Sequence, residues 1–172
     1  MGPRRRAQVR HFVTDMHEPF IQVIRAATSA TIVYDRFHIM KLLHRQIDEV
    51  RRRVQTRLPP PERKVVKNSR YLLLSNREDL SAKRAVRLQE LLAANTDITT
   101  AYLLKEDFRA LYQADAVRVA RPRFRDWIRR VKESGIPELQ KFVKTLKDHW
   151  RGVLAYFTSG RLSNGLAESF NN

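Results

Sequence analysis

Near the start of the chain, the hydrophobic positions form two short β-type runs separated by one helical run. Residues 9–14 and 30–34 are rich in β-branched and aromatic side chains, and an aspartate follows each run at once. This pattern predicts two strands. Between them, Pro19 stands where the first turn of a helix tolerates proline. The apolar residues of this helix are Phe20, Ile21, Val23 and Ile24. A strand, a helix and a strand in this short space predict a compact βαβ unit with parallel strands.

The rest of the chain carries helical periodicity. From Ile39 to Val54, apolar residues recur at spacings of three and four, which puts them on one face of a helix. The apolar positions are Ile39, Leu43, Ile47, Val50 and Val54, and the basic positions on the opposite side are Lys41, Arg45 and Arg52. We expect the three prolines at 59–61 to end this helix and to form a stiff connection.

Three further helices are expected in the middle of the chain. They cover roughly residues 81–94, 99–114 and 117–132, and the last of them is expected to break near Pro122. The short apolar run at 71–74 fits a strand or a helix, and its pattern does not decide between them.

The clearest helical pattern runs from Pro137 to Phe157. Its apolar positions are Leu139, Phe142, Val143, Leu146, Trp150, Val153 and Phe157. A separate basic band consists of Lys141, Lys144, Lys147 and Arg151. This band fits a surface that contacts phosphates and fits a solvated helix face equally well. We expect Trp127 and Trp150 to anchor the core.

Composition narrows the classes of function. The chain has 172 residues, and 34 Lys and Arg residues against 18 acidic ones give it a net charge of +16. This excess favours a nucleic acid or another acidic partner. The absence of cysteine excludes disulfides, thiolate zinc sites and cysteine nucleophiles. No apolar run approaches the ~20 residues of a membrane-spanning helix, and the first residues lack the core of a secretory signal. We therefore expect a cytoplasmic protein with no membrane partner and no small-molecule cofactor.

The two aspartates that follow the predicted strands, Asp15 and Asp35, are the first candidates for chemistry. In open α/β sheets, functional groups gather outside the carboxyl ends of strands. An acidic pair at such an edge, in a basic chain, suggests metal-assisted work on a polyanion. A structural role is the alternative, because Asp15 could end a strand or cap the next helix. Taken alone, His38 fits a structural residue and Glu168 fits a solvated helix acid.

Five segments, taken in order along the chain, carry a resemblance to a known family. They are Thr-Asp-Met at 14–16 with Pro-Phe at 19–20, Ile-Val-Tyr-Asp-Arg-Phe-His at 32–38, Ser-Gly-Ile-Pro at 134–137, Thr-Leu-Lys-Asp-His at 145–149, and Ser-Asn-Gly-Leu-Ala-Glu-Ser-Phe-Asn at 163–171. In this order they resemble the DDE transposases of the ISL3 group of insertion sequences. The resemblance covers residues 9–172.

The resemblance implies an α+β, mostly α chain in three parts. Residues 1–40 would supply part of an RNase H-like core, namely its last two strands in a βαβ arrangement. Residues 41–160 would form a large all-helical insertion. Residues 161–172 would begin the helix that carries the third acidic residue.

The resemblance also implies a chemistry for the intact parent protein. Three carboxylates would hold two Mg²⁺ or Mn²⁺ ions for the cleavage and strand transfer of DNA at transposon ends. Asp15 would be the second ligand and Glu168 the third, with Asp35 and His38 in supporting roles. In an alternative triad, Asp15, Asp35 and Glu168 would meet at the metals. A homodimer is compatible with this picture.

The first catalytic aspartate of the family has no counterpart here, because none of the fourteen residues before Asp15 is acidic. We therefore expect a truncated transposase that is inactive as an isolated chain, and the sequence leaves open whether the chain is itself an enzyme. Two other functions stay open. One is a non-catalytic basic helical module that binds nucleic acid, and the other is a structural, partner-binding helical protein.

Overall fold

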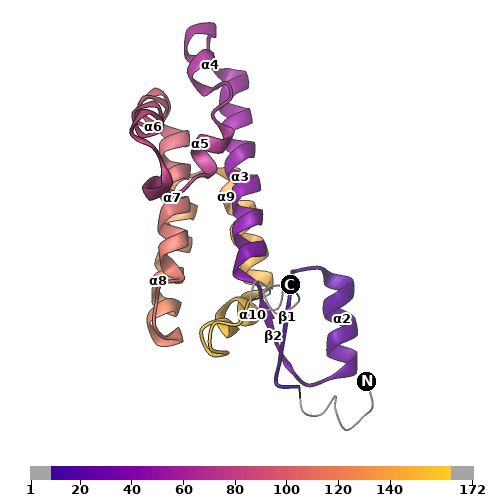
Figure 1. Ribbon diagram of the computed structural model, residues 1–172. Coiled ribbons are helices and arrows are strands. Elements are labelled where there is room, and N and C mark those ends of the chain that lie inside the picture. Colours follow the sequence, from indigo (N-terminus) through magenta and orange to yellow (C-terminus); the bar gives the residue numbers. More distant parts are fainter. Residues whose placement is uncertain (1–8, 164–172) are drawn as a thin grey trace, which may run out of the picture. The chain divides into compact units, whose positions relative to one another are not determined.

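A computed structural model describes residues 9–163, which are mostly helical with one two-stranded parallel sheet (Figure 1). This confirms the expected α+β, mostly α class. The chain divides into two compact units. Of the described residues, 9–41, 114–122 and 145–163 form the strand-containing unit, and 42–113 with 123–144 form the helical unit. No helix in the described part of the chain is long and apolar enough to cross a membrane.

The sheet of the strand-containing unit pairs β1 (His11–Thr14) with β2 (Thr31–Tyr34). The strands are parallel, and their register runs from His11 opposite Thr31 to Thr14 opposite Tyr34. Both strands are shorter than their predicted runs, but the predicted parallel pairing is confirmed. Successive residues of β2, Val33 and Tyr34, are both buried, so protein covers both faces of this strand.

The helix α2 (Glu18–Ala27) connects the two strands, and proline lies in its first turn as the sequence predicts. Ile21 and Ile24 of this helix are buried. Phe20 and Val23, which the sequence pattern assigns to the same apolar side, are 63% and 66% exposed. Only part of the predicted apolar side of α2 is therefore buried.

One face of β2 is covered by α10 (Trp150–Ala155). The expected single helix over 137–157 is therefore wrong, because the chain forms two helices there, α9 (Pro137–Asp148) and α10. His149 separates them, with φ −110° and ψ 17°. The buried face of the pair largely follows the predicted apolar stripe, although Trp150 is only half-buried.

The helix α3 (Arg36–Arg57) follows β2 directly and continues into the helical unit. Its predicted apolar face is confirmed, since all five of its positions are at most 4% exposed. The helix begins three residues before Ile39, the first residue of the sequence pattern.

Three short elements and two longer helices follow α3. They are α4 (Pro60–Val66), α5 (Arg70–Leu74), the 3₁₀ turn η1 (Arg77–Asp79), α6 (Ala82–Ala94) and α7 (Thr96–Leu111). The ambiguous run at 71–74 is helical. The expected stiff proline connection is wrong, because Pro60 and Pro61 begin α4. The first turn of a helix does not use its backbone N–H groups for intrahelical bonds, so proline is compatible with it.

The expected break near Pro122 is also wrong, because α8 (Val117–Glu133) runs through this proline. Pro122 is in the second turn, so the missing N–H removes one backbone hydrogen bond near the start of the helix. Farther along, Phe124 and Trp127 are fully buried. Packing of this face offsets the local cost of the proline.

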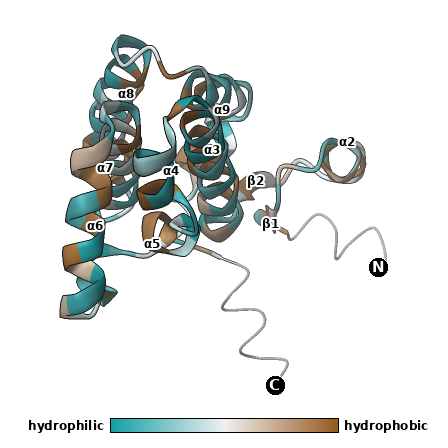
Figure 2. Ribbon diagram, turned by 90° about the horizontal axis from the view of Figure 1, so that it is seen from above, coloured by the Kyte–Doolittle hydropathy of each residue, from teal (hydrophilic) through white to brown (hydrophobic). Residues whose placement is uncertain are grey.

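The core of the helical unit holds a cluster of aromatic rings. The ring centroids of Phe108 and Trp127 are 4.7 Å apart, and those of Phe108 and Phe142 are 5.3 Å apart. The indole N–H of Trp127 donates to the carbonyl of Leu104 over 2.8 Å, so its polar atom is satisfied inside the core. Segments of α3, α7, α8 and α9 run side by side around this core (Figure 1, Figure 2). Trp127 thus anchors the core as predicted.

Candidate functional site

The two strand-end aspartates occupy equivalent positions on neighbouring strands. Asp15 follows Thr14 of β1 and Asp35 follows Tyr34 of β2, and Thr14 and Tyr34 are partners in the parallel register. The backbone N–H of Asp35 donates to the carbonyl of Thr14 over 3.0 Å, which extends the pairing by one residue. The structure therefore brings both aspartates to the same carboxyl-end edge of the sheet, as the pattern predicted.

Asp35 caps the amino end of α3. Its side chain is 3% exposed, and its Oδ1 accepts a hydrogen bond from the backbone N–H of Phe37 over 3.1 Å. Its Oδ2 lies 3.2 Å from Nδ1 of His38, and its carbonyl accepts from the N–H of Ile39. The bond to the backbone of Phe37 is that of an N-cap aspartate, and the His38 side chain contacts the second carboxylate oxygen. Both carboxylate oxygens are thus engaged within the first turn of the helix.

Asp15 differs from Asp35 in its exposure. Its side chain is exposed, and Oδ1 accepts from the backbone N–H of His17 over 3.2 Å, which forms a tight turn before α2. The cap position of α2 is His17 itself, so Asp15 does not cap this helix. Within residues 9–163, Oδ2 of Asp15 accepts no hydrogen bond. The carboxylate of Asp15 is therefore accessible to a ligand from solvent.

Glu168, the other residue expected to bind metal, lies outside the described residues. Within the described range 9–163, no three His, Asp or Glu side chains form a group that could hold a metal ion. Asp15, Asp35 and His38 therefore do not by themselves make a three-ligand site.

A contact between Tyr34 of β2 and His149, the residue before α10, was not predicted from the sequence. His149 Nδ1 lies 3.0 Å from the hydroxyl of Tyr34, and the two rings meet edge to face at 5.0 Å. Burial raises the pKa of the Tyr34 hydroxyl, which keeps it protonated. Next to this pair, Gly152 is so close to the Tyr34 ring that a Cβ there would overlap it. In the sequence, His149 stands out only as the last residue of the segment 145–149, which carries part of the family resemblance.

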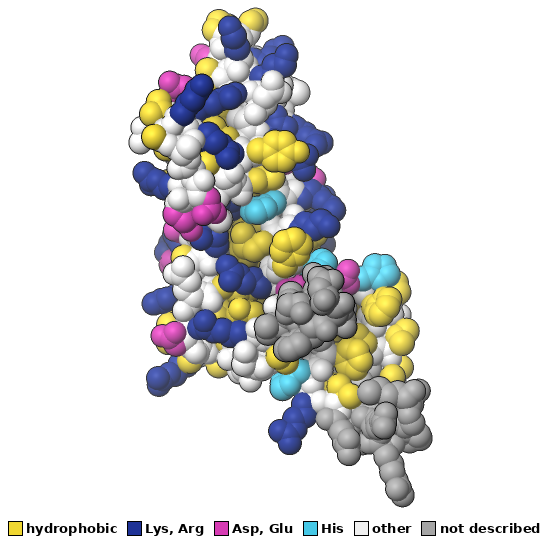
Figure 3. All heavy atoms as spheres, viewed as in Figure 1, with side chains coloured by type: hydrophobic (Ala, Val, Ile, Leu, Met, Phe, Trp, Pro, Cys, Tyr) yellow, Lys and Arg dark blue, Asp and Glu magenta, His cyan; other side chains and the backbone are white. Residues whose placement is uncertain are grey.

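The predicted basic band is exposed on two helices. Lys141, Lys144 and Lys147 lie on α9 and Arg151 lies on α10, and all four side chains are exposed. The break at His149 means that these residues do not share one continuous helix. Lys and Arg side chains also gather over the helical unit on the face seen in Figure 3.

A second set of basic residues, on α8, was not singled out from the sequence. It consists of four exposed arginines in the first half of the helix, Arg118, Arg121, Arg123 and Arg125. Their signal was available, because Arg118, Arg121 and Arg125 are spaced by three and four residues, which places them on one side of a helix. The expectation of a break at Pro122 hid this pattern.

Comparison with known proteins identifies the class. The family model of the ISL3 group, described as a transposase, matches residues 1–172. The chain is 34% identical over 176 residues to the transposase for insertion sequence element IS1001 from Bordetella parapertussis, an alignment that covers all of this chain and 43% of that protein. It is 26% identical over 197 residues to the transposase for insertion sequence element IS1557 from Mycobacterium tuberculosis, covering 99% of this chain and 44% of that protein.

The chain therefore belongs to the ISL3 family of transposases. It spans less than half the length of the curated relatives that it matches. No solved structure matches the chain.

Proposed function

We propose that this chain supplies part of the catalytic centre of a DDE transposase, which cleaves DNA and transfers strands. The observation that carries the proposal is the difference between the two strand-end aspartates. Asp15 presents an accessible carboxylate at the carboxyl end of β1, whereas both oxygens of Asp35 are occupied by its own helix. Asp15 is therefore the better candidate for a metal ligand, and the triad that includes Asp35 is disfavoured.

The proposed ligands from this chain are Asp15 and Glu168. Both offer carboxylate oxygens, which are the ligands that Mg²⁺ and Mn²⁺ prefer, and the exposed side chain of Asp15 fits such a role. Bound metal ions would stabilise the attacking and leaving oxygens of a phosphodiester. Residues 1–40 would belong to an RNase H-like core and residues 41–160 to a helical insertion within it.

Asp35 and His38 are proposed as positioning residues. By capping α3 and hydrogen-bonding to His38, the buried carboxylate of Asp35 holds the start of this helix at the end of β2, the strand that pairs with the β1 strand preceding Asp15. Their substitution would shift the edge of the sheet where Asp15 lies. It would not remove a ligand.

Metal binding by the 172-residue chain tests this proposal. We expect Asp15→Asn and Glu168→Gln each to weaken Mn²⁺ binding in calorimetric titrations, because each removes a charged oxygen ligand. Glu90→Gln changes an exposed carboxylate on α6 and serves as the matched control. Unchanged Mn²⁺ binding by Asp15→Asn would contradict the metal role of Asp15.

A nicking assay with Mg²⁺ and supercoiled DNA completes the test. The resemblance implies three carboxylates and this sequence matches two, so we expect no turnover by the isolated chain. Metal-dependent nicking that disappears in both Asp15→Asn and Glu168→Gln would contradict this expectation. It would favour the alternative in which Asp15, Asp35 and Glu168 together bind the metals.

The second candidate function is a basic helical module that binds nucleic acid without catalysis. The exposed arginines of α8 and the band on α9 and α10 favour it. DNA binding that is steeply dependent on salt, together with metal binding unaffected by Asp15→Asn and Glu168→Gln, would identify this alternative.

A further inference from the structure

We propose that the helical unit carries a binding site for an unpaired nucleotide of DNA, formed by Arg52, Arg70 and Tyr71. The base would stack on the ring of Tyr71, and the two arginines would contact the neighbouring phosphates. We call these three residues the Tyr71 platform. The inference rests on the proposed contact with DNA and deepens it, because it names the form of DNA that is recognised.

The charge of the platform comes from arginines that converge on one buried carboxylate. Asp48 of α3 is 5% exposed, and its Oδ1 accepts from Nε of Arg51 over 2.8 Å. Its Oδ2 lies 2.8 Å from a guanidinium nitrogen of Arg52 and 3.7 Å from Nε of Arg70.

One carboxylate cannot neutralise three guanidinium groups, so this cluster keeps an excess of positive charge. The excess faces solvent, because the side chains of Arg52 and Arg70 are 66% and 52% exposed. Both arginines approach the same oxygen of Asp48, which holds two like charges close together at the surface. Such an arrangement fits a partner with closely spaced anionic groups, and a phosphodiester backbone is one.

The aromatic part of the platform is unusually open. Tyr71 is 73% exposed, the largest value among the exposed large hydrophobic residues of the described chain. The guanidinium carbon of Arg70 lies 5.7 Å from the centroid of its ring. An open ring beside positive charge is the combination that single-stranded nucleic acid requires, since every base offers a face for stacking. A base within a duplex has both faces covered by its neighbours, so the platform fits an unpaired base.

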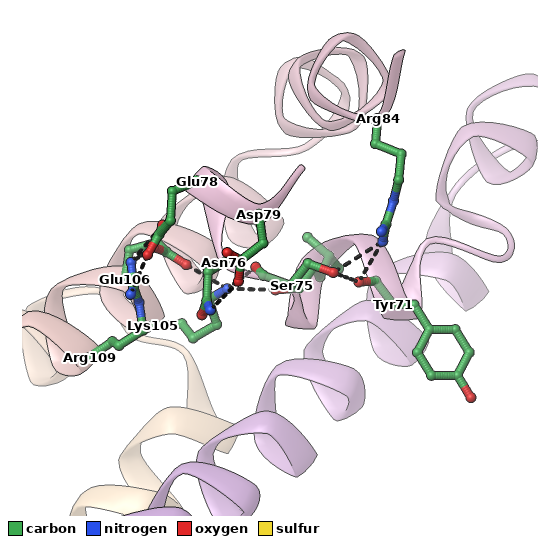
Figure 4. Close-up of polar contacts among 10 residues, drawn as sticks. Tyr71, Ser75, Asn76, Glu78, Asp79, Arg84, Lys105, Glu106 and Arg109 are labelled. Atoms are coloured by element: carbon green, nitrogen blue, oxygen red, sulfur yellow. Dashed lines mark hydrogen bonds and ion pairs between the residues drawn. The ribbon is translucent and has the colours of Figure 1, made fainter. Parts of the chain in front are cut away.

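The backbone under the ring is held in place before any ligand binds. Lys105 of α7 is 1% exposed, and its Nζ donates to the carbonyls of Leu73 and Ser75 over 2.9 and 2.8 Å. A guanidinium nitrogen of Arg84 donates to the carbonyl of Tyr71 and to the hydroxyl of Ser75. Figure 4 shows these contacts around Ser75 and the backbone of Tyr71, with the ring of Tyr71 pointing away from them. A fixed platform loses little conformational entropy on binding.

The test compares two DNA probes of equal length, a single strand that carries 2-aminopurine and the same strand in a full duplex. Binding to the 172-residue chain is followed by anisotropy at one fixed salt concentration. We expect Tyr71→Ala to weaken single-strand binding by about tenfold and to change duplex binding by less than about twofold. Tyr71→Phe keeps the ring and should bind as the unmodified chain does.

Stacking has its own spectroscopic signal. The 2-aminopurine fluorescence should be quenched on binding, and Tyr71→Ala should remove this quenching. Leu103→Ala removes a 51% exposed side chain from α7 and is the matched control for loss of an exposed apolar group. For the charges, Arg70→Gln should weaken single-strand binding, whereas Arg87→Gln on α6 should not.

Equal binding of the single strand by Tyr71→Ala and the unmodified chain overturns the inference. If the unmodified chain then still binds duplex DNA, the proposed function stands without the platform. If the unmodified chain binds neither probe, both the platform and the proposed DNA contact are overturned. A change of mass in sedimentation caused by Tyr71→Ala, with DNA binding unaffected, would assign the surface to protein contact and would also overturn the inference.

Discussion

Gly152 shows how one residue connects a local motif to the sheet. Its lack of a side chain lets α10 approach β2 so closely that the Tyr34 ring fills the space where a Cβ would be. The ring cannot move away easily, because Tyr34 is 2% exposed and its hydroxyl meets His149. The carbonyl oxygen of Ile32, only 3.2 Å from the same Cβ position, adds a backbone limit.

We expect Gly152→Ala to destabilise the protein by roughly 1–3 kcal/mol, the usual cost of inserting a methyl group into a packed interior. The measurement is urea unfolding followed by circular dichroism. Arg151→Ala changes the neighbouring exposed residue and should alter the unfolding free energy by less than about 0.5 kcal/mol. Equal stability of Gly152→Ala and the unmodified chain would contradict the close approach of α10 to β2.

Asp15 and Asp35 show how much of a candidate site the residue types alone can predict. Two strand-end carboxylates were visible in the sequence, and the parallel register places them where the pattern predicted. Their difference was not visible, because both follow a strand and both precede a helix by a short distance. The sequence offers Asp15 as a possible helix cap, yet the capping residue is Asp35. The deciding factor is where each helix starts, one residue after Asp35 and three after Asp15.

Among the elements, α5 depends most clearly on a contact from elsewhere in the chain. This five-residue helix is too short to be stable alone. Its last carbonyls receive the ammonium group of Lys105 from α7, which also pairs with Glu106 and lies 4.4 Å from the centroid of the Tyr102 ring. Burial lowers the pKa of Lys105, so these acceptors are what make a buried ammonium tolerable.

We expect Lys105→Met to destabilise the protein by roughly 2–4 kcal/mol, because the substitution keeps the size of the side chain but leaves buried carbonyls without their donor and removes one of the two cations paired with Glu106. Urea unfolding measures the change. Lys83→Met, at an exposed position of α6, is the control and should have little effect. A Lys105→Met protein as stable as the unmodified chain would show that the buried ammonium contributes no net stabilisation.

The prolines show why element boundaries were harder to predict than the elements themselves. Proline lacks an N–H group and so predicts a break, but the cost depends on its place in the helix. Pro60 and Pro61 lie in the first turn of α4, where the N–H groups are not used. Pro122 lies one turn into α8, and the buried face that follows it outweighs one missing bond.

At the scale of the whole molecule, charge is the property most directly tied to the proposed DNA contact. The net charge of +16 requires no particular fold, and it favours association with any polyanion. An experiment on DNA binding must therefore distinguish the effect of where a basic residue lies from the effect of the net charge. The α9 lysines, Lys141, Lys144 and Lys147, are suited to this because they are exposed on one helix.

We expect replacement of these three lysines by glutamine to reduce the slope of log K against log salt for duplex DNA by about 2–3, since each phosphate contact contributes about 0.9. The measurement is a series of anisotropy titrations between low and moderate salt. A control triple variant at Lys64, Lys67 and Lys83 removes the same charge from other exposed positions. Equal slopes for the two triple variants would contradict a specific role for the α9 lysines.

The sequence by itself determined the class of this protein and its main elements. Periodicity of apolar residues predicted the βαβ arrangement and the buried face of α3, because these patterns depend on neighbours along the chain. Ordered motifs predicted the ISL3 transposase family. The tertiary structure alone showed that the helix predicted over 137–157 breaks at His149, a residue whose side chain meets Tyr34, 115 residues away. It also distinguished the accessible Asp15 from the buried Asp35, because burial and hydrogen-bond partners depend on how distant segments pack.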